Sequence, residues 1–179
     1  MTASPHDSHR GPRGAQSEPQ ATDWLTPRQQ HIWRAYLAAT ARINENLDHR
    51  LRRFDLDLGE YEILVHLSEA PGRALRMSEL ADRVRQSRSR LTHTVSRMER
   101  KDILRRASCP SDGRGVIAEL TKVGMELLER AAPVHVASVR EALVDAVDPD
   151  DYEALGRAMT AVLEAAGGSP GWVTAPTRE

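Results

Sequence analysis

The chain has 179 residues, of which 40% are hydrophobic and 28% are charged, and its formal net charge is −1. This length and composition predict one soluble globular domain with short tails, and the total charge indicates no particular partner. The single cysteine, Cys109, excludes an internal disulfide framework and a cysteine-rich metal site, which favours a cytoplasmic protein. No apolar run is long enough for a membrane span, and the first residues lack the apolar core of a signal peptide.

The near-zero total conceals a segregation of charge. Residues 83–114 contain ten basic and three acidic residues, a net charge of +7, whereas the rest of the chain carries −8. A local positive field on an acidic body favours contact with nucleic acid. Two other interpretations stay open on charge alone: a solvated basic helix face, or a basic surface that docks an acidic protein.

The two ends of the chain differ in composition from the middle. Residues 1–22 are rich in Pro, Gly and polar side chains and predict a disordered N-terminal tail. Residues 167–179 have the same character and predict a flexible C-terminal tail. One domain is therefore expected over residues 23–166.

A long first helix is predicted over about residues 26–54. Thr26 is suited to be its N-cap, Pro27 to its first position, and Gln29 completes a Thr-x-x-Gln capping box. An apolar stripe continues to Phe54, which makes a rod of roughly 40 Å. A helix of this length ahead of a small domain is typical of packing on another subunit, although a core helix is the alternative.

Three shorter helices are predicted next. The first covers about residues 59–70 and stops at Pro71-Gly72. Ser78 is expected to cap the second, and Ser87 to cap the third, which runs to about Lys101. The three-residue break at positions 85–87 separates the second helix from the third.

After Lys101 the spacing of the apolar residues is no longer helical and becomes typical of short strands. Residues 103–108 and 116–120 are strand candidates on either side of a loop rich in turn residues, which predicts a β-hairpin with a basic tip. Thr121 is expected to cap a helix that Pro133 kinks or interrupts. Asp148 and Pro149 predict the start of a last helix. The fold class is mainly α with a small antiparallel wing.

Two short helices joined by a tight turn are typical of a helix-turn-helix, whose second helix enters the major groove of DNA. On the predicted third helix, Leu91, Val95 and Met98 form a narrow stripe that can pack inward. The opposite side carries groups able to reach base edges and phosphates, namely Ser89, Arg90, His93, Arg97 and Arg100. Residues 83–114 contain no Phe, Trp or Tyr for base stacking, which favours duplex DNA over single strands.

The predicted hairpin adds a second set of cations. Arg105 and Arg106 lie on its first strand, and Arg114 lies at its tip, where one arginine can enter a narrow minor groove. Asp112 is spaced to hold the Arg114 guanidinium or to brace the turn. A surface hairpin with an incidental ion pair is the alternative.

These segments resemble a known family. MSELADRV (77–84), QSRSRLTHTVSRMERK (86–101), ILRR (103–106) and SDGRGVIAELT (111–121) are similar to the winged helix-turn-helix of MarR-family transcriptional regulators. The spacing of Asp112 and Arg114 before Leu120-Thr121 resembles the wing signature of that family. The resemblance covers about residues 24–166, and departs from the family at Arg85 and Asp102, where glycine is common.

The resemblance implies a ligand-responsive repressor that binds a pseudo-palindromic operator as a homodimer. It implies a DNA-binding lobe over about residues 58–121 and dimerisation helices over about 26–54 and 121–166. It also implies a small aromatic or phenolic effector. The residues expected to contact DNA are Ser87, Arg88, Ser89, Arg90, His93, Thr94, Arg97, Arg106, Asp112 and Arg114.

Four aromatic or imidazole side chains are candidates for the ligand site: Trp33, Tyr36, His49 and His66. No histidine has a recognised zinc spacing, so no metal site and no cofactor are expected. The chain lacks a phosphate-binding glycine loop and a nucleophile elbow, so it is not expected to be an enzyme. The alternatives are a non-specific architectural DNA-binding protein and a redox-responsive regulator that uses Cys109.

Overall fold

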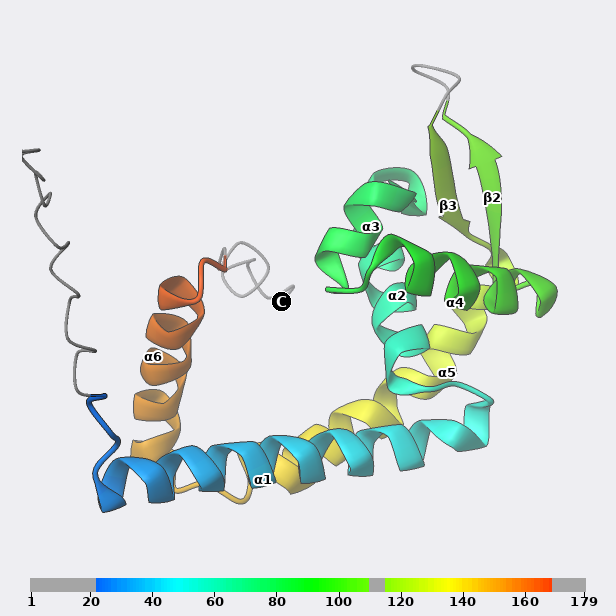
Figure 1. The fold of residues 1–179 in the computed structure, drawn as a ribbon. Helices are drawn as coiled ribbons and strands as arrows, with labels where there is room; N and C mark the ends of the chain where they lie inside the picture. Colours follow the sequence, from blue (N-terminus) through cyan, green and yellow to red (C-terminus); the bar gives the residue numbers. More distant parts are fainter. Residues whose placement is uncertain (1–21, 110–114, 169–179) are drawn as a thin grey trace, which may run out of the picture. The chain divides into compact units, whose positions relative to one another are not determined.

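The computed structural model describes residues 22–109 and 115–168 of the chain. The chain divides into two compact units, residues 1–36 and residues 37–179. The helix α1 (Pro27–Leu51) begins in the first unit and ends in the second. The second unit carries all the other helices and strands drawn in Figure 1.

The start of α1 follows from its sequence. The Thr26 amide donates to Oε1 of Gln29 at 2.8 Å, and the Gln29 amide donates to Oγ1 of Thr26 at 3.3 Å. The predicted capping box is therefore confirmed. The helix is shorter than predicted, because residues 52–54 form a tighter 3-10 turn that ends at Asp55 with φ 56°.

Three helices form the centre of the second unit: α2 (Leu58–Glu69), α3 (Met77–Arg83) and α4 (Arg88–Arg100). Asp57 and Glu60 make a capping box at the start of α2, a signal that the sequence prediction of a start near Gly59 did not use. The prediction of Ser78 as a cap is wrong: α3 begins at Met77, and Arg76, two residues before Ser78, occupies the cap position.

A three-stranded antiparallel sheet lies beside these helices, and its strand order is β1 (Ala74–Arg76), β3 (Val116–Leu120), β2 (Leu104–Ser108). Figure 1 shows the two longer strands, β2 and β3. The predicted hairpin is formed by β2 (Leu104–Ser108) and β3 (Val116–Leu120). The third strand, β1 (Ala74–Arg76), pairs with β3 and was not predicted, because three residues are too few to show an alternating pattern.

Ile103 precedes β2 and joins two helices through its backbone. Its amide donates to the carbonyl oxygen of Met98 at 3.1 Å, and its own carbonyl accepts from the Thr121 amide at 3.2 Å. The end of α4 and the start of α5 (Lys122–Val139) are thereby held together.

Two helical segments complete the chain after β3. Thr121 caps α5 as predicted, since its Oγ1 accepts from the Gly124 amide at 3.0 Å. The prediction that Pro133 interrupts this helix is wrong, because α5 runs through it to Val139 and only then widens into a π-helical turn over residues 140–144. Asp148 caps α6 (Pro149–Ala165) as predicted.

One apolar core lies in the second unit, among α2, α3, α4, α5 and the sheet. Its most deeply buried side chains come from all of these elements and from the end of α1, and include Leu51, Ile63, Leu64, Leu67, Leu80, Leu91, Val95, Met98, Leu104, Ala118 and Ala131. In contrast, α6 buries no residue. Across the described ranges, no helix is long and apolar enough to span a membrane.

Candidate nucleic-acid interface

The helices α3 and α4 are joined by a four-residue turn, residues 84–87. The Gln86 amide donates to the carbonyl oxygen of Ala81 at 3.0 Å, which folds the turn back on α3. Arg85 has φ 51°, a left-handed conformation that favours glycine. Asp102, after α4, has φ 57°. The two positions at which the sequence departs from the family glycines are therefore positions with left-handed backbone.

The N-terminus of α4 is capped by Ser87, whose Oγ accepts from the Arg90 amide at 3.3 Å. Leu91, Val95 and Met98 are fully buried and fix the inward side of the helix. The inward stripe predicted from the sequence is thus confirmed. Burial of these three side chains also determines which residues of α4 face solvent.

The exposed side of the first two turns of α4 is formed by Arg88, Ser89, Arg90, Thr92 and His93. Within the described part of the chain, neither Arg88 nor Arg90 makes an ion pair with an acid, and the first turn holds no acidic residue. Cations at a helix N-terminus oppose the helix dipole, so helix stability does not explain them. Their arrangement suits contact with an external polyanion.

Thr94 differs from the other predicted contact residues of α4, because only 8% of its surface is exposed. Its hydroxyl donates to the carbonyl oxygen of Arg90 at 3.2 Å. In this structure Thr94 therefore packs on the inward side of the helix and supports the turn that carries Arg90.

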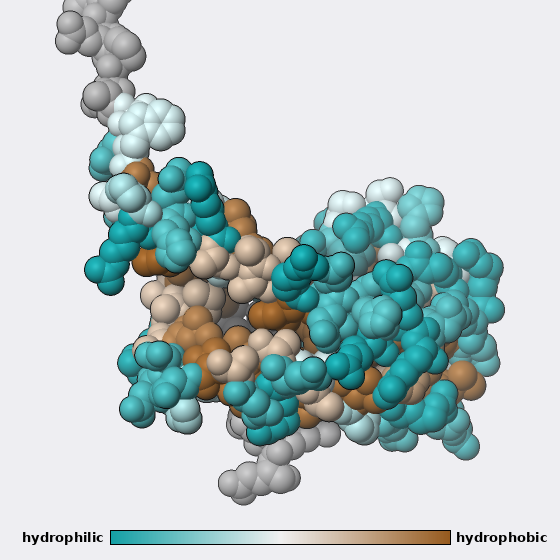
Figure 2. Space-filling model, turned by 90° about the horizontal axis from the view of Figure 1, so that it is seen from below, coloured by the Kyte–Doolittle hydropathy of each residue, from teal (hydrophilic) through white to brown (hydrophobic). Residues whose placement is uncertain are grey.

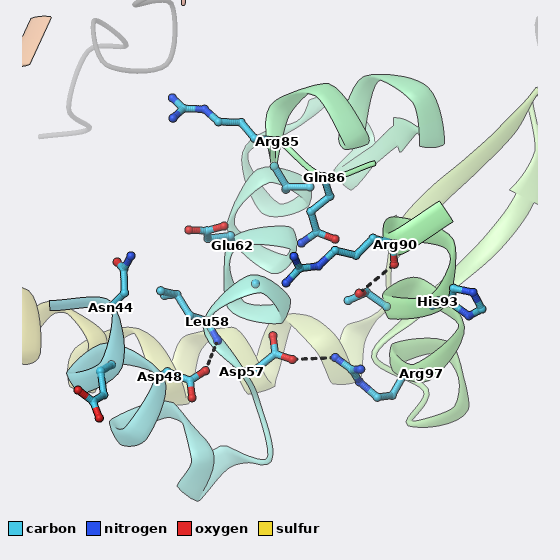
Figure 3. Close-up of a pocket in the computed structure, with 14 residues that line it drawn as sticks. Asn44, Asp48, Asp57, Leu58, Glu62, Arg85, Gln86, Arg90, His93 and Arg97 are labelled. Atoms are coloured by element: carbon cyan, nitrogen blue, oxygen red, sulfur yellow. Dashed lines mark hydrogen bonds and ion pairs between the residues drawn. The ribbon is translucent and has the colours of Figure 1, made fainter. Parts of the chain in front are cut away.

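A polar cleft of about 820 Å³ lies between α4, α2 and the end of α1 (Figure 3). Asp48 of α1 accepts from the Leu58 amide at 3.1 Å and thus binds the N-terminus of α2. This backbone hydrogen bond, followed by one from the Arg52 side chain, lowers the pKa of Asp48. On the other side of the cleft, Arg97 reaches from α4 to Asp57 at 2.7 Å.

Arg97 has a second and more buried partner. Its Nε donates to Oε1 of Glu60 at 2.8 Å, and the Glu60 side chain is only 3% exposed. The hydrogen bond to Glu60 raises the pKa of Arg97, so the guanidinium is held in its charged form. Sequence reasoning did not identify Glu60, although the Asp-x-x-Glu pattern at 57–60 is a recognisable capping signal.

The wing strands carry two further arginines. Arg105 pairs with Glu119 on the neighbouring strand, and Arg106 pairs with Glu99 of α4. The Cys109 amide donates to the carbonyl oxygen of Gly115 at 2.8 Å across the hairpin, and the Cys109 side chain is buried. Asp112 and Arg114, predicted to contact DNA from the tip, lie outside the described residues.

A second cavity of about 540 Å³ lies among α1, α2, α3 and α5. Apolar and polar side chains share its wall, among them Leu47, Val65, His66 and Glu69. The ring of His135 stacks on Tyr61 with a centroid distance of 4.3 Å, and both residues line the cavity. Burial lowers the pKa of His66 and that of His135, which favours neutral imidazoles.

Of the four ligand candidates predicted from the sequence, only His66 is among the residues that line this cavity. His49 lies elsewhere on α1, and Trp33 stacks on Tyr36 at 5.8 Å between ring centroids, with both rings partly exposed. The sequence did not single out Tyr61 and His135 together, because they lie 74 positions apart and meet only when α2 packs on α5.

The described side chains include no group of three or more His, Cys, Asp or Glu residues arranged to hold a metal ion. What the second unit presents is a capped basic helix behind a tight turn, flanked by a β-hairpin (Figure 1). This arrangement defines a winged helix-turn-helix DNA-binding protein.

Comparison with known proteins agrees with this class. A sequence profile described as MarR family matches residues 54–115. The crystal structure of AbsC, a MarR family transcriptional regulator from Streptomyces coelicolor, is 42% identical, with a TM-score of 0.78 over 83% of this chain and 100% of that one. Sco3205 from the same organism, solved in complex with DNA, is 43% identical, with a TM-score of 0.76 over 80% of this chain and 94% of that one.

A curated relative, the transcriptional regulator MhqR of Bacillus subtilis, is 25% identical over 62% of this chain and 74% of its own length. The chain therefore belongs to the MarR family and is a DNA-binding transcriptional regulator rather than an enzyme. Its mainly helical fold with a small antiparallel wing is the fold that the sequence predicted.

Proposed function

We propose that this regulator is a homodimeric, cytoplasmic repressor that reads a pseudo-palindromic operator and releases it when a small aromatic ligand binds. The observation that carries the proposal is the exposed N-terminal half of α4. Arg88 and Arg90 lie there without an acidic partner among the described residues, and the opposite side of the helix is buried in the core. Helix residues in this position reach base edges when the helix enters a major groove.

The residues proposed to contact DNA fall into two groups according to the part of the DNA that their side chains suit. Arg90 and His93 offer donors for base edges, whereas Ser87, Arg88 and Arg106 suit phosphates. Ser89 lies between these groups on the same exposed turn. Thr94 supports Arg90 from the inward side in the free protein. From the wing, Arg114 enters the minor groove and Asp112 orients it, which favours A·T-rich flanks.

The homodimer is supported by apolar surface that the described residues of one chain leave exposed. Figure 2 shows brown apolar patches among the hydrophilic side chains of the surface. The helix α6 is amphipathic yet buries no residue, and its Val162 is 56% exposed. Val136 of α5 is 54% exposed. An amphipathic helix is stabilised mainly by packing its apolar face. A second copy of the chain supplies the partner, and the two-fold axis matches an operator with two half-sites.

The ligand proposal is supported by the cavity that His66, Tyr61 and His135 line. Its volume of about 540 Å³ lies in the range of small-molecule sites, and mixed apolar and polar walls suit an aromatic acid or a phenol. Because the cavity adjoins α1, α2 and α5, a ligand there can change how the DNA-binding lobe is held.

The proposal is tested with a random pool of duplexes of about 30 bp, long enough for two half-sites. Selection by the purified protein should enrich a pseudo-palindrome, and footprinting should protect both halves. Uniform coating without enrichment would identify an architectural DNA-binding protein instead. Benzoate and phenol are then titrated into the complex, and release of the duplex is expected.

The dimer is tested by native mass spectrometry. Val162→Glu should shift the protein toward monomer because it buries a charge at the interface, whereas Arg157→Glu on the same helix is the polar control. A monomeric wild-type protein that still protects both half-sites would contradict the homodimer.

A further inference from the structure

Arg97 lies on α4, the helix proposed to enter the DNA groove, yet its guanidinium faces the start of α2. Figure 3 shows the side chain extending from α4 toward Asp57, with the ion pair drawn between them. One edge of the guanidinium contacts Asp57 at 2.7 Å, and Nε contacts Glu60 at 2.8 Å. Both acids belong to the start of α2, so Arg97 joins two helices of the DNA-binding lobe.

The buried Glu60 carboxylate relies on Arg97 for its counter-charge. Glu60 is 2% exposed, and one of its carboxylate oxygens already accepts from the Asp57 amide at 3.0 Å in the capping box. Arg97 supplies the cation that faces the other oxygen. If Arg97 turned outward to DNA, a buried carboxylate would lose its counter-charge, and such a loss is strongly unfavourable.

We propose that Arg97 is a positioning residue: it fixes the orientation of α4 against the α2 capping box and does not itself contact DNA. The inference rests on the proposed role of α4 in the DNA groove. It assigns Arg97 a different task from Arg90, although the sequence pattern places both on the outer face of one helix. Arg90 makes no ion pair in the described residues and is free to reach DNA.

The test compares Arg97→Gln, Glu60→Gln and the double variant on two probes, the selected duplex and a mixed-sequence duplex of about 30 bp. Glu60 is buried and cannot touch DNA, so an effect of Glu60→Gln on binding must act through the protein. In Glu60→Gln the new amide oxygen accepts from the Asp57 N–H, which turns the amide NH₂ group toward the Arg97 donor. In the double variant that NH₂ group instead meets the amide oxygen that Arg97→Gln introduces.

The expected result is a loss of affinity of roughly 5- to 30-fold in each single variant and recovery to within about threefold in the double variant. The slope of log K against log salt should stay unchanged throughout, because no phosphate contact is removed. A slope that falls by about one for Arg97→Gln, or a double variant that is not rescued, would overturn the proposal.

Two further variants keep the outcome decisive. If Arg97→Gln fails to fold, as judged by circular dichroism, Arg97→Lys replaces it: a lysine keeps a phosphate contact but cannot bridge both carboxylates. Positioning therefore predicts lost affinity at constant slope, and contact predicts near-normal binding. Arg90→Ala tests the proposed function separately, because it should weaken binding to the selected duplex more than binding to the mixed-sequence duplex, whatever Arg97 does.

Discussion

Glu99, in the last turn of α4, accepts three hydrogen bonds from Arg106 on β2. The Arg106 side chain donates through Nε at 2.9 Å and Nη2 at 2.7 Å, and its amide donates at 3.1 Å. The side-chain contact, followed by the backbone contact, lowers the pKa of Glu99. The wing is thereby attached to the end of the helix proposed to enter the major groove.

Glu99→Gln should weaken this attachment and leave Arg106 with an unneutralised charge. Because both side chains are about one-third exposed, the expected loss of stability is about 0.5–1 kcal/mol, or roughly 1–4 °C in Tm. On a mixed-sequence duplex the salt slope should stay the same or steepen. Arg106→Ala is the matched variant, and its slope should fall by about one if Arg106 contacts a phosphate. A shallower slope in Glu99→Gln would contradict this arrangement.

Gly124, in the first turn of α5, is packed too closely for any side chain. A Cβ there would lie 2.0 Å from the Ile103 carbonyl oxygen and 2.7 Å from Cδ1 of Leu120. Gly124→Ala should therefore cost about 2 kcal/mol or more and lower Tm by roughly 4–8 °C. Gly156→Ala is the control, because nothing lies within 4 Å of its Cβ and alanine favours the α6 helix. Equal shifts in the two melting curves would refute the packing argument.

Asp102 has a left-handed backbone, with φ 57°. Asp102→Gly should leave stability unchanged or raise it by up to about 1 kcal/mol, because glycine adopts this conformation without a steric cost. Asp102→Val should lower it by about 2 kcal/mol, since a β-branched residue resists positive φ. The Thr121 hydroxyl binds the Asp102 carbonyl at 2.7 Å, and this backbone contact stays in both variants. Chemical denaturation measures both changes, and the opposite order of stability would show that the strain argument fails.

His135 should make the protein less stable in mild acid. Burial lowers its pKa below the usual 6.5, so the unfolded chain binds more protons than the folded one. The stability contributed by neutral His135 is present above pH 6.5 and declines as the pH falls toward the lower folded pKa. His66 contributes in the same direction, mainly through burial, which lowers its pKa. Glu62 has a raised pKa from burial and also binds its proton more readily in the folded chain, so it opposes the trend at lower pH.

The measurement is Tm between about pH 7.5 and pH 5.5, the range in which histidine titrates. His135→Phe keeps a ring over Tyr61 and removes the titrating group, so its Tm should fall less over this range than the wild-type Tm. Identical pH profiles for the two proteins would exclude His135 as a source of the dependence.

Much of the fold was predictable because its signals are local. Caps at Thr26, Ser87, Thr121 and Asp148 occur where the sequence predicts them, since each side chain binds an amide two or three residues away. The same locality explains two errors. Ser78 has the chemistry of a cap but lies within the first turn of α3, and Pro133 has the chemistry of a helix breaker but lies inside α5, which continues through it.

The candidate interface was predictable in composition but not in the roles of its members. Helical periodicity separates Leu91, Val95 and Met98 from the polar face, and burial confirms the division. Helical periodicity cannot distinguish Arg90 from Arg97, because the two residues are seven positions apart and therefore lie on the same face of α4. Only the approach of α2 gives Arg97 two acidic partners, one of them buried, and leaves Arg90 exposed.

The sequence by itself determined the class of this protein: a basic helix behind a tight turn, a wing, and a segregation of charge beneath a net charge of −1. Each of these depends on residues close together in the chain. The tertiary structure decided which cations are neutralised, which histidines are buried and where the cavities lie. Those properties depend on distances between segments such as 57–60 and 97, or 61 and 135, that become neighbours only when the helices pack.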